Sequence, residues 1–153
     1  MKTKIVYVLV SKETDYFYEM VLLSLYSFRM YHPKDTVELV MDEATYERLV
    51  DKNATILNDV TPIVVSIPSE YSQMQRSRYL KTQLRQLLKG DFLYLDCDTL
   101  VCDSLEEIDN TIADIAMVLD RHGKALPSSV IELRRHAGFL NLDNEPYYNR
   151  VII

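Results

Sequence analysis

The chain of 153 residues has only three glycines, two cysteines and no long hydrophobic run. With 48% hydrophobic and 26% charged residues, this composition is ordinary for a soluble globular protein and argues against extensive disorder. Residues 5–10 are apolar, but this run is too short for a signal peptide or a membrane span, and no other run is long enough. These features predict one soluble cytoplasmic domain without a transmembrane segment.

The two cysteines, Cys97 and Cys102, are too few to suggest a disulfide framework or a zinc site. They are better interpreted as packing residues in a reducing compartment. The net charge of -6 disfavours a general nucleic-acid binder, which needs a basic face to displace counterions. It leaves small anionic ligands open, because a few local cations and a metal ion can hold them.

Strand and helix patterns alternate along the first half of the chain. In order they are a strand at 5–10, a helix at 16–31, a strand at 36–41, a helix at 44–50 and a strand at 58–67. Thr14 or Asp15 is expected to cap the first helix, and His32-Pro33 to end it. The alternation predicts an α/β fold, with a mostly parallel sheet, right-handed crossovers and helices on both faces.

A further helix is predicted over residues 72–88, where apolar side chains recur at helical spacing. Its other side is basic, and most of these cations are best interpreted as a solvated face. Arg78 and Lys81 are exceptions, since residues three positions apart share a helix face and could bind a diphosphate from the same side.

The apolar strand pattern Phe92–Leu95 leads directly into two carboxylates, Asp96 and Asp98. If the chain is still extended there, both side chains point to the same side and can face one ligand. Two such close charges repel unless a cation lies between them, and Mg²⁺ or Mn²⁺ takes oxygen ligands while keeping places for water and phosphate. The alternative is a turn in which both aspartates face water. We favour the metal site, because α/β sheets bind ligands at the ends of central strands.

Weaker patterns follow this motif. Asp103 or Ser104 is expected to cap a short acidic helix, and a strand pattern over residues 112–119 ends at Asp120. Asp120 is either a turn residue or another carboxylate at a strand end. The remaining patterns are a short helix at 128–135, an extended piece at 139–141 and a turn into a strand at 146–153.

With these residues in place, the chain resembles the family 8 glycosyltransferases, relatives of glycogenin and of bacterial lipopolysaccharide hexosyltransferases. The most specific part is Phe92–Val101 followed by Asp103-Ser104-Leu105, which is similar to the Asp-X-Asp strand of that family and the acidic helix behind it. The resemblance implies a GT-A, Rossmann-like fold. It also implies transfer of a hexose from a nucleotide-diphosphate sugar, with a UDP-sugar favoured, to a glycan or other hydroxyl acceptor.

The resemblance also implies roles for individual residues around the motif. In the family the motif aspartates bind a manganese ion that holds the donor diphosphate, which implies Mn²⁺ (or Mg²⁺) at Asp96 and Asp98. Cys97, between them, joins the predicted nucleotide-binding set. Either Arg78 or Lys81 matches the basic residue that binds the donor.

Three more positions take roles from the resemblance. Val10 and Ser11 match the place where family members hold the nucleotide base. Asp120 resembles an aspartate near the transferred sugar and is the candidate catalytic residue.

The chain departs from the family near its C-terminus. Family members continue from Tyr-Phe-Asn into a small residue and Gly-Val, whereas here Tyr147-Tyr148-Asn149 precedes Arg150-Val151. His122 and His136 come too early to match the later metal-binding histidine and are predicted to be surface residues. Residues 1–153 are therefore expected to form a single GT-A-like nucleotide-sugar-binding domain that lacks the C-terminal acceptor part.

Two other interpretations stay open. The segment Asp96–Ser104 is also similar to the first motif of haloacid-dehalogenase-type phosphatases, in which the first aspartate attacks phosphorus and the second is a general acid or base. That motif usually begins its domain, whereas several strand patterns precede it here. The other interpretation is a non-catalytic domain that binds a metal and a nucleotide and pairs with another copy through its apolar C-terminal edge strand.

Overall fold

The computed structural model describes residues 1–112, 114, 116–119 and 148–152. The chain divides into two compact units, residues 1–112 and residues 113–153, and each is described by itself. Within the described residues, none of the helices combines the length and the apolar character needed to cross a membrane.

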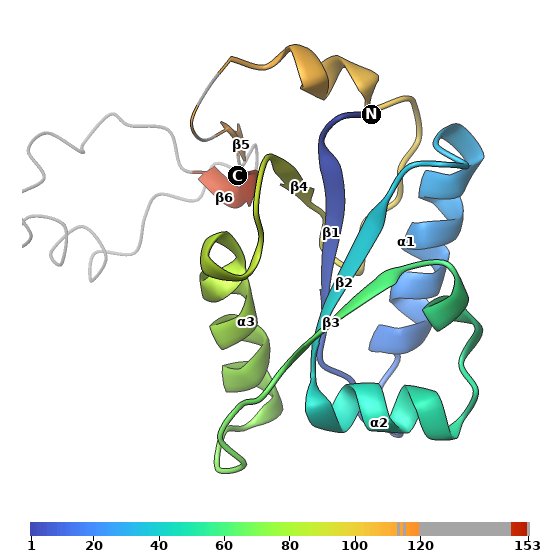
Figure 1. Cartoon of the computed structure of the whole chain (residues 1–153), viewed down its shortest axis with the longest axis vertical. Helices are drawn as coiled ribbons and strands as arrows, with labels where there is room; N and C mark the ends of the chain where they lie inside the picture. Colours follow the sequence, from blue (N-terminus) through green and yellow to red (C-terminus); the bar gives the residue numbers. More distant parts are fainter. Residues whose placement is uncertain (113, 115, 120–147, 153) are drawn as a thin grey trace, which may run out of the picture. The chain divides into compact units, whose positions relative to one another are not determined.

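The first unit is built on a four-stranded sheet in which all neighbouring strands are parallel (Figure 1). The strand order is β3-β2-β1-β4. The strands are β1 (Lys4–Leu9), β2 (Val37–Asp42), β3 (Thr61–Val65) and β4 (Phe92–Tyr94). The chain therefore adds strands in one direction as far as β3 and then returns to the opposite side of β1 with β4.

The two inner strands form because their sequences suit burial on both faces. Every residue of β2 is buried, as are all residues of β1 except the first, which is typical of strands in parallel sheets. Most polar groups there have partners, although Glu38 Oε2 is buried with no hydrogen-bond partner among the described residues. The hydroxyls of Tyr7 and Ser24 are hydrogen-bonded at 2.9 Å, and Lys4 Nζ donates to Glu38 Oε1 at 2.8 Å.

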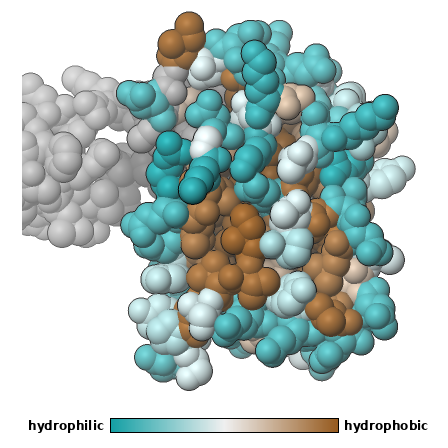
Figure 2. All heavy atoms as spheres, viewed as in Figure 1, coloured by the Kyte–Doolittle hydropathy of each residue, from teal (hydrophilic) through white to brown (hydrophobic). Residues whose placement is uncertain are grey.

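Helices cover both faces of this sheet. They are α1 (Phe17–Tyr31), α2 (Glu43–Asp51) and α3 (Gln73–Leu87), and Figure 1 shows α1 and α3 on opposite sides of the strands. α1 buries Val21 and Phe28, and α3 buries Leu80 and Leu84. In Figure 2 hydrophobic residues gather near the middle of the viewed face, with hydrophilic residues around them. The predicted α/β class, with a parallel sheet and helices on both faces, is confirmed for this unit.

Several predicted boundaries were wrong in detail. The N-cap of α1 is Tyr16, not Thr14 or Asp15, although Asp15 Oδ1 accepts a hydrogen bond from the Phe17 N–H at 3.2 Å. The strand expected over 58–67 is shorter, because its first residue ends a 3₁₀ turn, η1 (Thr55–Asn58). The acidic helix after the motif is a second 3₁₀ turn, η2 (Glu106–Asn110), whose N-cap, Leu105, has no side chain that could accept a hydrogen bond.

The second unit contains an antiparallel pair of strands, β5 (Ala116–Leu119) and β6 (Tyr148–Ile152), with an irregularity after Val118. The strand expected over 112–119 therefore begins later, at Ala116. The predicted C-terminal strand is present and pairs within its own unit. The predicted segments 128–135 and 139–141 lie outside the described residues, as do Asp120, His122 and His136.

Candidate functional site

A cavity of about 580 Å³ opens where β1 and β4 end, bordered by the start of α1 and the first half of α3. β1 leads through α1 to β2 on one side, whereas β4 pairs with β1 on the other side. Such a reversal of strand order is where open α/β sheets leave a ligand crevice at the carboxyl ends of their strands. The lining residues are Val8, Leu9, Val10, Phe17, Met20, Gln73, Met74, Ser77, Arg78, Lys81, Asp96, Cys97 and Asp98.

The structure brings Asp96 and Asp98 to this cavity together, but not on an extended strand. β4 ends at Tyr94, and the backbone N–H of Thr99 donates to the Asp96 carbonyl at 3.1 Å. The Thr99 hydroxyl donates to the same oxygen at 2.6 Å. The aspartates therefore lie in a tight turn, as in the alternative interpretation of the sequence, and not on an extended strand. The turn itself delivers both carboxylates to the cavity.

Asp96 is the more buried of the two aspartates and has cationic and phenolic neighbours. Its Oδ1 accepts hydrogen bonds from Lys81 Nζ at 2.7 Å and from the Tyr94 hydroxyl at 2.5 Å. Lys81 Nζ also lies 5.6 Å from the centre of the Tyr94 ring, within the range of a cation–π interaction. Because both charged groups are partly exposed, the ion pair adds little stability. Its main effect is to hold an ammonium group beside the carboxylates.

Arg78 lies on the same side of α3 as Lys81 and also lines the cavity. The sequence left open which of the two binds the donor, and the structure places both at the site. Their environments differ, because Lys81 is paired with Asp96, whereas within the described residues no ion pair of Arg78 occurs. Arg78 is exposed, and its planar guanidinium suits bidentate contact with phosphate oxygens.

Val10 and Ser11 follow β1 but lie against different cavities. Val10 is buried and lines the larger cavity, and its carbonyl accepts a hydrogen bond from Gln73 Nε2 at 3.0 Å. Ser11 lines a separate hollow of about 190 Å³ beside α2. Its backbone N–H donates to Thr45 Oγ1 at 3.2 Å, and its hydroxyl donates to Asp15 at 3.0 Å. Only Val10 of this predicted pair therefore lines the cavity that holds the aspartates.

Cys97 lies between the two aspartates, and its thiol donates to the Val8 carbonyl at 3.2 Å. Burial raises the pKa of this thiol to about 12, and the negative charges of Asp96 and Asp98 act in the same direction. The thiol is therefore neutral near pH 7, and it attaches the turn to β1. Both Cys97 and Cys102 are free. Cys97 is partly buried, but Cys102 is exposed, so the prediction that it is a packing residue was wrong.

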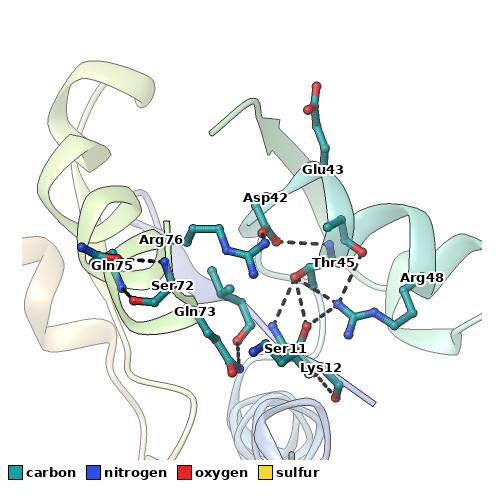
Figure 3. A network of polar contacts seen from close by, with 12 residues as sticks. Ser11, Lys12, Asp42, Glu43, Thr45, Arg48, Ser72, Gln73, Gln75 and Arg76 are labelled. Atoms are coloured by element: carbon teal, nitrogen blue, oxygen red, sulfur yellow. Dashed lines mark hydrogen bonds and ion pairs between the residues drawn. The ribbon is translucent and has the colours of Figure 1, made fainter. Parts of the chain in front are cut away.

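Sequence reasoning missed a polar network that holds α3 at the ends of the inner strands (Figure 3). Arg76 Nη1 donates to Asp42 Oδ2 at 2.6 Å, and the Thr45 N–H donates to Asp42 Oδ1 at 3.1 Å. Gln73 Nε2 donates to Asp15 as well as to Val10. An aspartate directly after an apolar strand was the available signal for Asp42, but its partner lies 34 positions away. This network fixes the part of α3 that carries Arg78 and Lys81.

The residues at the cavity fit a divalent ion that shares its coordination with a ligand. Asp96 and Asp98 supply hard oxygen donors, the type that Mg²⁺ and Mn²⁺ prefer. Within the described residues no group of three or more histidine, cysteine, aspartate or glutamate side chains could hold a metal by itself. A two-carboxylate site suits an ion whose other ligands are water and phosphate oxygens.

No protein-family model matches the chain, and no curated protein sequence is significantly similar to it. The fold and the cavity define an open parallel α/β domain. At the point where its strand order reverses, two aspartates and two basic side chains line one cavity.

Proposed function

We propose that this cavity binds a nucleotide-diphosphate sugar together with Mn²⁺ or Mg²⁺, and that the protein is a metal-dependent hexosyltransferase. The observation that carries the proposal is the gathering of two carboxylates and two cations at one cavity. A diphosphate needs cations around its oxygens, and a divalent ion needs carboxylates. The resemblance to family 8 glycosyltransferases favours UDP as the nucleotide and a hydroxyl group as the acceptor.

Different lining residues bind the diphosphate, the metal ion and the nucleotide. Arg78 and Lys81 bind and orient the diphosphate through charge-assisted hydrogen bonds. Asp96 and Asp98 hold the metal, which when bound stabilises negative charge on the departing nucleoside diphosphate. The apolar residues that line the cavity, with Val10 among them, exclude water from the nucleotide.

Transfer of the hexose also requires a residue beside the transferred sugar. Asp120, which the resemblance places near the transferred sugar, lies outside the described residues. The binding step can be tested without it, because all residues assigned to the diphosphate and the metal belong to the first unit.

Calorimetric titration of UDP with and without MnCl₂ tests the proposal. We expect binding that depends on Mn²⁺ and weakens at least tenfold in Asp96→Asn, Asp98→Asn and Arg78→Ala. Asp91→Asn is the matched control, since Asp91 is an exposed carboxylate before β4, at the opposite end of that strand. A folded protein that binds no nucleoside diphosphate in the presence of Mn²⁺ contradicts the proposal.

Two further assays separate the alternatives. Hydrolysis of p-nitrophenyl phosphate that is lost in Asp96→Asn, without UDP binding, supports the phosphatase interpretation instead. Mn²⁺-dependent UDP binding without sugar transfer or hydrolysis of a UDP-hexose leaves a binding domain.

A further inference from the structure

The outward side of α1 is mostly apolar, and Glu19 is its one exposed charged residue. Six large side chains on this helix are exposed, and we call them the α1 outer face: Phe17, Met20, Leu23, Tyr26, Met30 and Tyr31. The most exposed of them are Leu23 at 62%, Tyr26 at 70% and Met30 at 66%. The opposite side of the same helix packs on the sheet through Val21, Leu25 and Phe28. A helix that is apolar on both sides is normally covered on both sides.

From this face we propose that α1 is the contact surface of a homodimer, in which two copies of the chain pack their α1 outer faces against each other. The inference does not rest on the proposed function. Of the six side chains of the α1 outer face, Phe17 and Met20 also line the cavity that holds Asp96 and Asp98, and the other four do not.

The exposed area is sufficient for such a contact. With a full area of roughly 200 Å² for each large side chain, the exposed fractions of the six residues amount to about 650 Å² per copy. Two copies would bury about 1,300 Å² in total, within the range of roughly 1,200–2,000 Å² of specific protein interfaces. Tyr16 and Leu100, exposed by 75% and 66%, are further large apolar side chains outside the helix. Exposed apolar areas of this size on a soluble protein usually mark an interaction site.

The composition of the face suits a second copy of the same surface. Aromatic residues and methionine are enriched at the centres of protein interfaces, and five of the six residues are of these types. α1 is described over its whole length, and Glu19 is the one charged residue among its exposed positions. In an antiparallel pair with Leu23 at the two-fold axis, the two Glu19 side chains lie toward opposite ends of the contact. No like charges then face each other.

The same composition argues against a lipid surface as the occupant. Helices that bind membrane surfaces carry lysine and arginine along their polar side, whereas Arg29 is the one basic residue of α1. Arg29 is already paired with Asp59 at 3.1 Å. The net charge of -6 also opposes attraction to anionic lipids.

The antiparallel pairing predicts specific neighbours. With Leu23 on the axis, Met20 faces Tyr26 of the partner subunit, because each lies three residues from the centre. The segment after the aspartates lies along the same helix, since the Val101 N–H donates to Ser27 Oγ at 2.9 Å and the Tyr31 hydroxyl donates to the Cys102 carbonyl at 2.8 Å. The partner copy would therefore lie close to the turn that carries the candidate metal ligands.

Sedimentation equilibrium of the full chain tests the proposal. We expect a mass of about twice 17.9 kDa at micromolar concentration, and Leu23→Glu should weaken association at least a hundredfold while circular dichroism is unchanged. Val50→Glu is the matched control, because Val50 is 45% exposed on α2 and does not belong to the α1 outer face. A monomeric wild type at 100 µM, or a dimer that survives Leu23→Glu, overturns the proposal. Monomers that cosediment with phosphatidylcholine vesicles overturn it in favour of a lipid partner.

Cross-linking tests the orientation and does not depend on the charge substitution. In a Cys102→Ser background, Leu23→Cys should form a disulfide-linked dimer rapidly on mild oxidation, because the two substituted positions meet at the axis. Glu47→Cys, on the exposed side of α2, should not. Equal cross-linking at both positions would show random collision and overturn the α1 contact.

Discussion

Replacing Arg76 by methionine tests whether the ion pair at the end of β2 holds α3 in place. The Asp42 side chain is 3% exposed and Arg76 Nη1 lies 2.6 Å from it. Methionine keeps most of the length and packing of the arginine but removes its charge and its hydrogen bonds. Arg76→Met therefore leaves the buried Asp42 carboxylate with the hydrogen bond from the Thr45 N–H and without its cation.

The size of the effect follows from the burial of the carboxylate. Removing one partner of a buried ion pair costs about 3–5 kcal/mol, because the remaining charge stays desolvated. The N–H of Thr45, at the start of α2, still stabilises Asp42, and Arg76 is itself 21% exposed, so we expect the lower end, about 3 kcal/mol. The Arg76 Nε is buried with no hydrogen-bond partner in the part of the chain that the structure describes, so losing the arginine also relieves a cost and keeps the effect from being larger.

Urea unfolding followed by circular dichroism measures this loss as a change in the free energy of unfolding. Arg85→Met is the matched control, since Arg85 is exposed on the same helix and donates only to the Gly90 carbonyl within the described residues. It should change the stability by less than about 1 kcal/mol. In the double variant Asp42→Asn with Arg76→Met, part of the loss should be recovered, because no buried charge remains unpaired. An unfolding free energy of Arg76→Met within about 0.5 kcal/mol of the wild type would refute the reasoning.

Three further predictions concern single side chains of the first unit. Leu80→Ala, at a fully buried position of α3, should lower the unfolding free energy by about 2–5 kcal/mol in the same assay, and an effect below 1 kcal/mol would contradict the packing described. Burial raises the pKa of the Tyr7 hydroxyl to about 12 from an ordinary value of 10.0. The unfolding free energy of the wild type should therefore fall as the pH rises from 10 to 12, and Tyr7→Phe should lack the part of this fall that comes from Tyr7. Hydrogen bonds from the backbone N–H groups of Lys2 and Thr3 lower the pKa of Asp109 from 3.8 to about 2. The stability that Asp109 adds should therefore be present above pH 4 and disappear toward pH 2. The melting temperatures of the wild type and Asp109→Asn should converge on acidification, and a difference that stays constant with pH would contradict this.

The sequence was sufficient to predict the sheet because its strands are apolar and alternate with helical patterns. β1 and β2 are buried on both faces, so burial and sequence pattern agree there. The pairing of β1 with β4 was not readable, since it joins Lys4 to Phe92 across most of the unit. The position of Asp96 and Asp98 at the carboxyl end of β4 was predicted, and a turn there was the alternative interpretation. The sequence did not indicate that this turn, closed by the Thr99 side chain, would bring both carboxylates to the cavity.

The site was harder to predict than the sheet, because its geometry depends on contacts between distant residues. Asp42 meets Arg76 only after β2 and α3 have packed on the same sheet. Ser11 follows Val10 in the sequence, yet the backbone turns it toward α2 and a different cavity. Lys81 and Arg78 share a helix face as predicted. The ion pair between Lys81 and Asp96, which gives the two cations different environments, depends on the turn after β4.

The strand order has a consequence for how the cavity comes into existence during folding. β1, β2 and β3 can pair as soon as the first 65 residues are available, whereas β4 pairs with β1 across a long sequence separation, Lys4 with Phe92, and is synthesised after them. Long-range parallel pairing is slow, because its loop-closure entropy is paid before any contact forms. The edge of β1 that receives β4 is therefore expected to stay open during synthesis, and the cavity to form in the last folding step. A ligand that binds this cavity at one hundred times its Kd would stabilise the completed sheet by about 2.7 kcal/mol, and would thereby keep β4 paired with β1.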